Sequence, residues 1–156
     1  VVWDIASGKI IRRMEEGETV NAVSFSPDAK YVFSGSNDQL VKLWDVASGT
    51  TRSIPTEHNG LLTSVAFSPD GRYLATLGRH TDSAIRVLST TDFGVVQRYQ
   101  AHDLCGAIIR FSPDGKMLAS GSDDESVRLY RIAPILSDKA QSATLHSSSG
   151  AIPAAH

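Results

Sequence analysis

Apolar residues along the chain fall into short alternating runs, separated by clusters of Gly, Asn, Asp and Ser. Such alternation predicts β-strands with one buried face, and no stretch keeps the period of 3.6 that would predict an amphipathic helix. We therefore expect an all-β chain of short antiparallel strands. The expected strands cover residues 10–14, 20–25, 31–33, 41–44, 51–54, 62–67, 73–75, 85–88, 95–99, 108–111, 117–119 and 127–130.

One turn sequence occurs three times between these runs. Phe-Ser-Pro-Asp begins at Phe25, Phe67 and Phe111, so the copies start 42 and 44 residues apart, and a glycine follows the second and third copies. Proline, aspartate and glycine suit a tight turn between two strands, and self-similarity at this period indicates stacked repeats. Ala29 follows the first copy, where we expect it to cost about 1 to 2 kcal/mol if the turn needs a positive φ.

The register of these turns divides the chain into units. The first residues, Trp3-Asp4-Ile5-Ala6-Ser7-Gly8, match Trp44-Asp45-Val46-Ala47-Ser48-Gly49, so the chain is expected to be a piece of a longer protein. The third full unit has no expected fourth strand. We expect a partial unit over 1–14, four-stranded meanders over about 16–55 and 58–99, a third unit over 102–132, and a disordered Ala/Ser-rich tail over 133–156.

Composition limits the kinds of partner and the cellular compartment that we expect. A formal net charge of −2 offers no basic field for nucleic acid or anionic lipid, and no apolar run is long enough to span a membrane. Cys105 is the only cysteine, which excludes an internal disulfide. We expect an intracellular protein, cytoplasmic or nuclear, that binds other proteins or peptides.

These motifs resemble the WD-repeat family of β-propellers, and the resemblance covers residues 1–132. It implies blades of four-stranded antiparallel sheets, each braced by a hydrogen-bonded set of His, Ser or Thr, Asp and Trp. Carried over by position, the sets are Ser34, Asp38 and Trp44 in the first unit, His58, Thr76 and Asp82 in the second, and His102, Ser120 and Asp124 in the third.

No unit has all four members of the set. Leu88 and Tyr130 stand at the Trp position of the second and third units, and Glu16 stands where the first unit should have His. Because Glu16 would face the carboxylate of Asp38, we expect its side chain to turn toward solvent.

The same His, hydroxyl and Asp residues could be interpreted as catalytic groups, but they recur once per repeat, as a structural brace does. No Gly-X-Ser-X-Gly elbow, glycine-rich phosphate loop or pair of histidines at helical spacing is present. We therefore expect no catalytic residue, no metal site and no cofactor.

The second unit has two extra residues between Thr76 and Asp82. They lengthen a turn that carries Arg79 and His80, on the face of the propeller where Asn59 is also expected. Loops on a rigid scaffold commonly carry recognition, so these three residues are a candidate partner-binding loop, although a tolerated surface insertion is the alternative.

Three blades cannot close a ring, since propellers need at least four. The chain is expected to form an open arc that is prone to self-association. The predicted function is a non-enzymatic protein–protein interaction scaffold. The alternative is a regulatory or sensing region of a larger multidomain enzyme, such as a nucleotide-hydrolysing signalling protein or a kinase.

Overall fold

The computed structural model describes residues 1–100 and 102–132. Within these residues every regular element is a strand, as the alternating pattern predicts. The tail expected over 133–156 lies outside the described residues. No helix that could cross a lipid bilayer occurs in the described part of the chain.

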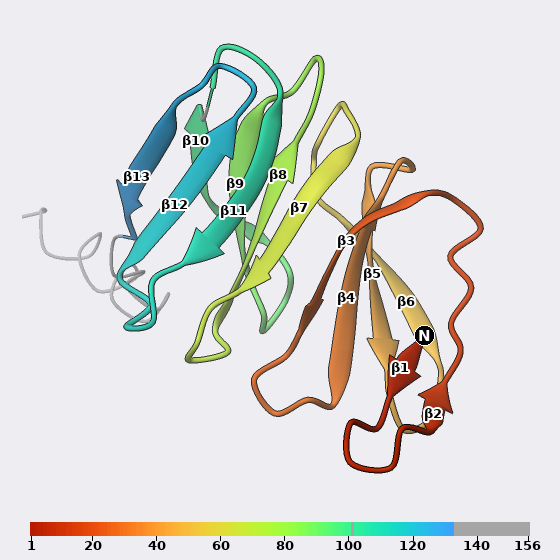
Figure 1. Cartoon of the computed structure of the whole chain (residues 1–156). Coiled ribbons are helices and arrows are strands. Elements are labelled where there is room, and N and C mark those ends of the chain that lie inside the picture. The colour runs from red at the N-terminus through yellow and green to blue at the C-terminus, as the bar shows by residue number, and fades with distance from the viewer. Residues whose placement is uncertain (101, 133–156) are drawn as a thin grey trace, which may run out of the picture.

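The strands form three antiparallel sheets and one short hairpin, arranged side by side (Figure 1). We call the sheets blades one to three and the hairpin the half-blade. Blade one contains β3 (Val20–Phe25), β4 (Tyr31–Ser36), β5 (Leu40–Asp45) and β6 (Thr51–Pro55). Blade two contains β7 (Leu62–Phe67), β8 (Tyr73–Gly78), β9 (Ala84–Ser89) and β10 (Val95–Gln100). Blade three contains β11 (Gly106–Phe111), β12 (Met117–Ser122) and β13 (Val127–Arg131), and the half-blade contains β1 (Val2–Trp3) and β2 (Ile10–Arg12).

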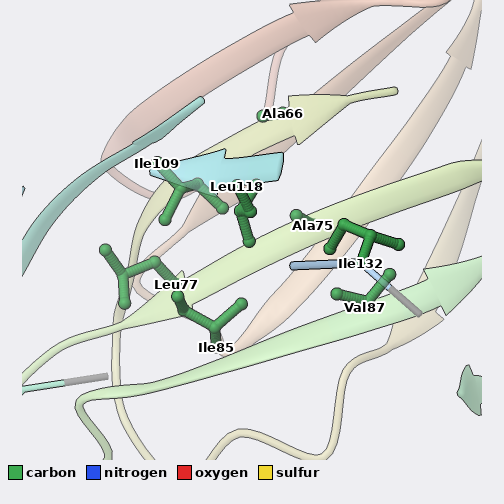
Figure 2. Packing of buried hydrophobic residues seen from close by; sticks show 8 residues of the cluster. All are labelled: Ala66, Ala75, Leu77, Ile85, Val87, Ile109, Leu118 and Ile132. Carbon is green, nitrogen blue, oxygen red and sulfur yellow. The ribbon is translucent and has the colours of Figure 1, made fainter. Parts of the chain in front are cut away.

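The core lies between the blades. In Figure 2 the side chain of Ile109, from the first strand of blade three, lies near Leu77 and Ile85 of blade two, and all three are fully buried. Leu62 and Val65 of blade two belong in the same way to a cluster with blade one. Blades two and three therefore each bury their first strand against the sheet before it, and the three blades form an open arc (Figure 1).

The first strand of each blade contains a β-bulge at the same place. The register shifts between Val20 and Ala22, between Leu62 and Ser64, and between Gly106 and Ile108. A bulge inserts one residue into the ladder and redirects its side chain. The inserted residues are Asn21, Thr63 and Ala107.

Two of these residues connect neighbouring blades. The Asn21 amide donates to the main-chain oxygen of Leu62 at 2.9 Å, and the Thr63 hydroxyl donates to that of Gly106 at 2.8 Å. Ala107 has no polar group to offer.

The three repeated turns share one geometry. Gly71 and Gly115 have φ of 75° and 70°, and Ala29 has φ of 57° at the same position. In each turn the serine hydroxyl donates to the aspartate. The left-handed conformation expected at Ala29 is therefore confirmed.

Ala29→Gly is expected to raise the free energy of unfolding by about 0.5 to 1 kcal/mol. Glycine avoids the strain of about 1 to 2 kcal/mol that a Cβ causes in this conformation, but it loses more backbone entropy on folding, which offsets part of the gain. Urea denaturation measures the change. Gly71→Ala, whose new Cβ would make only ordinary contacts with Pro27 at 3.7 Å or more, is the matched variant and should destabilise by a similar amount. A midpoint that does not rise in Ala29→Gly would contradict the prediction.

Candidate interaction face

In blade three, His102 connects strand β12 to the turn before β13. Its Nε2 lies 2.7 Å from the Ser120 hydroxyl, and its Nδ1 lies 2.9 Å from an Asp124 carboxylate oxygen. The Ser126 hydroxyl also donates to Asp124. These hydrogen bonds, that of Ser126 foremost, hold the pKa of Asp124 far below its usual range. The set ties together two loops at the upper end of the blades in Figure 1, which we call the loop face.

Blade two contains the same arrangement with one member missing. His58 Nε2 lies 2.9 Å from the Thr76 hydroxyl and Nδ1 lies 3.0 Å from Asp82. The main-chain N–H of Asn59 donates to the same carboxylate at 3.1 Å. Leu88 is fully buried and has no N–H, so Thr76 receives no bond of the kind that an indole would supply.

The environment of His58 keeps its ring neutral. Burial, together with the charge of the nearby Arg86 guanidinium, lowers the pKa of His58 to about 4. A neutral ring with its proton on Nδ1 donates to Asp82 and accepts from the Thr76 hydroxyl, which satisfies all three groups.

The free energy of unfolding is expected to fall as the pH is lowered from about 6.5 to about 4, because the unfolded chain protonates His58 at a higher pH than the folded chain does. The stability is fully present above pH 6.5, and the loss from His58 reaches about 3 kcal/mol at most. Urea denaturation across this range measures it. His58→Gln should remove this part of the pH dependence and the exposed-site variant His80→Gln should keep it. The same slope in both variants would contradict the prediction.

Blade one corrects an expectation, because Glu16 does not turn toward solvent. Its side chain is only 5% exposed, and its Oε2 accepts a 2.6 Å hydrogen bond from the Ser34 hydroxyl. Ser34 in turn accepts the indole N–H of Trp44 at 2.9 Å. Glu16 thus takes the place of the missing histidine.

Lys42 explains why two carboxylates can share this site. Its Nζ lies 3.3 Å from Glu16 Oε1 and 3.5 Å from Asp38 Oδ2. Burial alone would lower the pKa of Lys42, but the two carboxylates raise it above its ordinary value. The shared cation removes the repulsion on which the expectation for Glu16 was based.

A cation of this kind belongs to all three sets, and sequence analysis missed it. In each blade it stands four residues after the aspartate, on the third strand, and forms an ion pair with it. The pairs are Lys42–Asp38 at 3.5 Å, Arg86–Asp82 at 3.0 Å and Arg128–Asp124 at 3.7 Å. The repeated Asp-X-X-X-Lys/Arg spacing was the signal that could have revealed it.

A polar groove of about 310 Å³ lies on the loop face, where the three blades meet. It is lined by all three inserted residues and by the lengthened turn. The lining residues are Asn21, Asn37, Leu61, Thr63, Arg79, His80 and Ala107. The structure therefore brings Arg79 and His80 into a shared site, whereas Asn59 stands on the adjacent loop outside the lining.

The lengthened turn is held in place by blade three. The Arg79 guanidinium lies 3.2 Å from Asp123, and His80 adopts a positive φ of 66°. The Cys105 thiol lies 4.0 Å from the imidazole Nδ1 of His80, and a hydrogen bond with Arg79 lowers its pKa. Arg79 and His80 nevertheless remain exposed.

Sequence analysis also missed the inserted residues that line the groove. Their signal was a slip in the alternation, since Val20 is followed by Val23 and Leu62 by Val65, three residues on rather than two. Within residues 1–100 and 102–132, no three His, Cys, Asp or Glu side chains are grouped so that they could hold a metal ion.

Comparison with known proteins bears on the fold and the family. The family model described as "WD domain, G-beta repeat" matches residues 8–45, 49–89 and 94–131. A solved structure of RRP9 WD40 repeats superposes with a TM-score of 0.70, at 23% identity, over 80% of this chain and 38% of that one. This likeness shows that the two share a fold.

Curated relatives are longer proteins. Protein HIR1 of Yarrowia lipolytica is 33% identical over 72% of this chain. Transcription initiation factor TFIID subunit 5 of Caenorhabditis elegans is 30% identical over 75% of it. The chain spans only 12% and 18% of the length of these two proteins.

Proposed function

Because the chain belongs to the WD domain, G-beta repeat family, we propose that it is a non-enzymatic scaffold that binds a segment of a partner protein in the groove of the loop face. The single observation that carries this proposal is the groove itself, in which side chains from all three blades converge. A surface built from three repeats is held in shape by their packing, which limits the entropy lost on binding.

The chemistry of the groove indicates the kind of segment. Arg79 and His80 are exposed and can donate hydrogen bonds, and Asn37 and Thr63 add polar atoms beside them. These groups suit a peptide that carries a carboxylate or main-chain oxygen acceptors. With a net charge of −2, neither nucleic acid nor a membrane surface is part of the proposal.

In this proposal the sets of His, hydroxyl and Asp residues have a structural role. The hydroxyls of Thr76 and Ser120 belong to buried residues and are engaged by the histidines, so a substrate could not reach them. We propose that these sets, with those of blade one, brace the loops that form the groove. No feature of the described residues favours a regulatory region of a larger enzyme.

We place the chain inside the cell, in the nucleus or cytoplasm. One relative is by name a subunit of a transcription initiation factor, which supports this placement.

A pull-down followed by titration tests the groove. The chain captures a partner from cell extract, and the dissociation constant of the identified partner is then measured for variants. The double variant Arg79→Ala/His80→Ala is expected to bind at least about tenfold more weakly, the usual size of an interface hot-spot effect. Arg72→Ala is the control, because Arg72 is exposed in a repeated turn away from the groove. Equal affinity of the double variant and the control would remove the groove as the binding site.

A further inference from the structure

A pocket of about 620 Å³ lies between blades one and two, at the end of the strands opposite the loop face (Figure 1). The turns that follow β3, β7 and β9 form its rim. Blades one and two are complete four-stranded sheets, and none of the lining residues belongs to the half-blade or to blade three. The pocket also shares no lining residue with the groove of the loop face.

Three phenylalanines form an apolar floor in this pocket. The ring of Phe33, from blade one, lies against those of Phe67 and Phe93 from blade two, with centroid distances of 5.1 Å and 6.1 Å. Phe33 is almost fully buried, whereas Phe67 and Phe93 are only partly buried. An aromatic floor in a cavity of this volume suits a bulky apolar side chain.

Phe93 stands where the other repeats have glycine. Its main-chain N–H donates to the oxygen four residues before it, as those of Gly8 and Gly49 do in their turns. The two glycines have φ of 65° and 78°, and Phe93 has φ of 62°. A bulky residue is strained in this conformation, and backbone strain is concentrated at functional sites.

This phenylalanine changes the surroundings of an arginine on the preceding outer strand. Arg12 on β2 and Arg52 on β6 each pair with the residue before the tryptophan of a Trp-Asp sequence. Arg12 lies beside Gly49 and donates to two main-chain oxygens of that turn. A Cβ on Gly49 would lie 3.1 Å from the Arg12 guanidinium, so a side chain at this place moves the arginine away from the turn.

Arg52 shows the result of that displacement. Its guanidinium lies over the ring of Phe93, 4.9 Å from the centroid. Within residues 1–100 and 102–132, no acceptor and no carboxylate is paired with it. Arg52 is exposed, so its donors face the mouth of the pocket and are free to bind an anion.

The two carboxylates at the rim are already engaged. Asp28 forms an ion pair with Lys30 at 3.5 Å, and Asp70 forms one with Arg72 at 2.7 Å. Each also accepts a hydrogen bond from the serine of its own turn. Arg52 is therefore the charged group of the pocket that still lacks a partner, and its complement is a carboxylate.

We propose that this pocket binds an acidic peptide segment of a second partner protein. A Phe or Leu side chain of that segment lies on the phenylalanine floor, and a neighbouring Asp or Glu carboxylate is bonded by Arg52. A guanidinium holds a carboxylate through two parallel hydrogen bonds, and its stacking on Phe93 restricts its position before binding. The proposal is independent of the groove, so the scaffold would hold two segments at opposite ends of its blades.

Selection from a library of random heptapeptides tests the specificity of the pocket. The bait is the 156-residue chain with Arg79→Ala/His80→Ala, which removes the exposed cationic and aromatic side chains of the groove. The enriched peptides are expected to carry Phe or Leu beside Asp or Glu. Enrichment of basic peptides, or of no peptide, would overturn the proposal. Because the bait lacks the groove residues, failure of the groove would not change this result.

Titration of the most enriched peptide against variants locates the site. Arg52→Met keeps an unbranched side chain over the ring but removes the charge, and should weaken binding at least about tenfold. Replacing the acidic residue of the peptide by Gln should weaken binding to the unaltered chain but not to Arg52→Met. Arg98→Met is the matched control, because Arg98 is an exposed arginine on the outer strand of blade two and is paired with Glu57. Equal affinity of the Arg52→Met and Arg98→Met chains would contradict the role of Arg52.

Phe93→Gly separates binding from packing, since it restores the glycine of the other repeats. The variant is expected to be folded, as circular dichroism would show, and to bind the enriched peptide at least about tenfold more weakly. A variant that loses stability but keeps the peptide affinity would mean that the ring serves packing alone. That result would overturn the pocket as the peptide site.

Discussion

Lys42→Met is expected to lower the free energy of unfolding by about 3 kcal/mol, because it leaves two carboxylates facing each other without the cation between them. The lysine Nζ lies 3.3 Å from Glu16 and 3.5 Å from Asp38, and the Glu16 side chain is almost fully buried. Lys42 also donates to the main-chain oxygen of Glu16 at 2.6 Å, so the loop before β3 should loosen as well. Chemical denaturation monitored by tryptophan fluorescence measures the loss.

Two variants separate this effect from the general cost of losing a lysine. Lys30→Met removes an ion pair with Asp28 in which both side chains are largely exposed, and should cost less than about 0.5 kcal/mol. Glu16→Gln combined with Lys42→Met should recover part of the loss, because only one carboxylate then remains. A loss below about 1 kcal/mol in Lys42→Met would show that solvent screens this site and that the ion pairs contribute little.

Gly78→Ala is expected to destabilise the chain by about 3 kcal/mol, at the upper end of overpacking costs. A Cβ on Gly78 would lie 2.1 Å from the main-chain oxygen of Asp82 and 2.7 Å from Nδ1 of His58. The His58 Nδ1 is held by its hydrogen bond to the Asp82 carboxylate, and the Asp82 oxygen belongs to the main chain, so neither atom can move without a cost. Thermal denaturation should show the loss.

Gly121→Ala is the control for this prediction. Its Cβ would approach only the Cγ2 of Ile108, at 3.3 Å, and a side chain can shift by a few tenths of an ångström. We expect a loss below about 1 kcal/mol, close to the ordinary cost of a small volume change. If the two glycine variants were equally stable, the lengthened turn could not be as close to β8 as the structure has it.

Local signals explain why so much of the fold could be predicted. Each strand is marked by its own alternation, and each repeated turn carries residues whose backbone preferences require that turn, as the φ values at Gly71 and Gly115 confirm. The motifs and their spacing predicted the repeat family, and the match of the family model confirms it.

Features that depend on contacts between distant residues could not be predicted in this way. The orientation of Glu16 depends on Lys42, which lies on β5, the third strand after Glu16. The need for glycine at position 78 could not be predicted either. The other two blades have Ser36 and Ser122 at this position, so the repeat pattern alone would favour a serine. The lengthened turn, which brings the Asp82 oxygen against β8, removes the space for any side chain.

Hydrogen bonds in both directions join the first strands of neighbouring blades. Asn21 donates to blade two and Thr63 to blade three, while the main-chain N–H groups of Phe67 and Ile109 donate to Ser24 and Ser64 of the preceding blades. In a repeat protein, where stability is shared mainly between neighbours, such bonds secure both blades of a junction. Under a pulling force on residue 132, blade three would be restrained by the bond from Thr63 and would transmit the load to β7, so the junction between blades two and three sets the mechanical strength of this end of the arc.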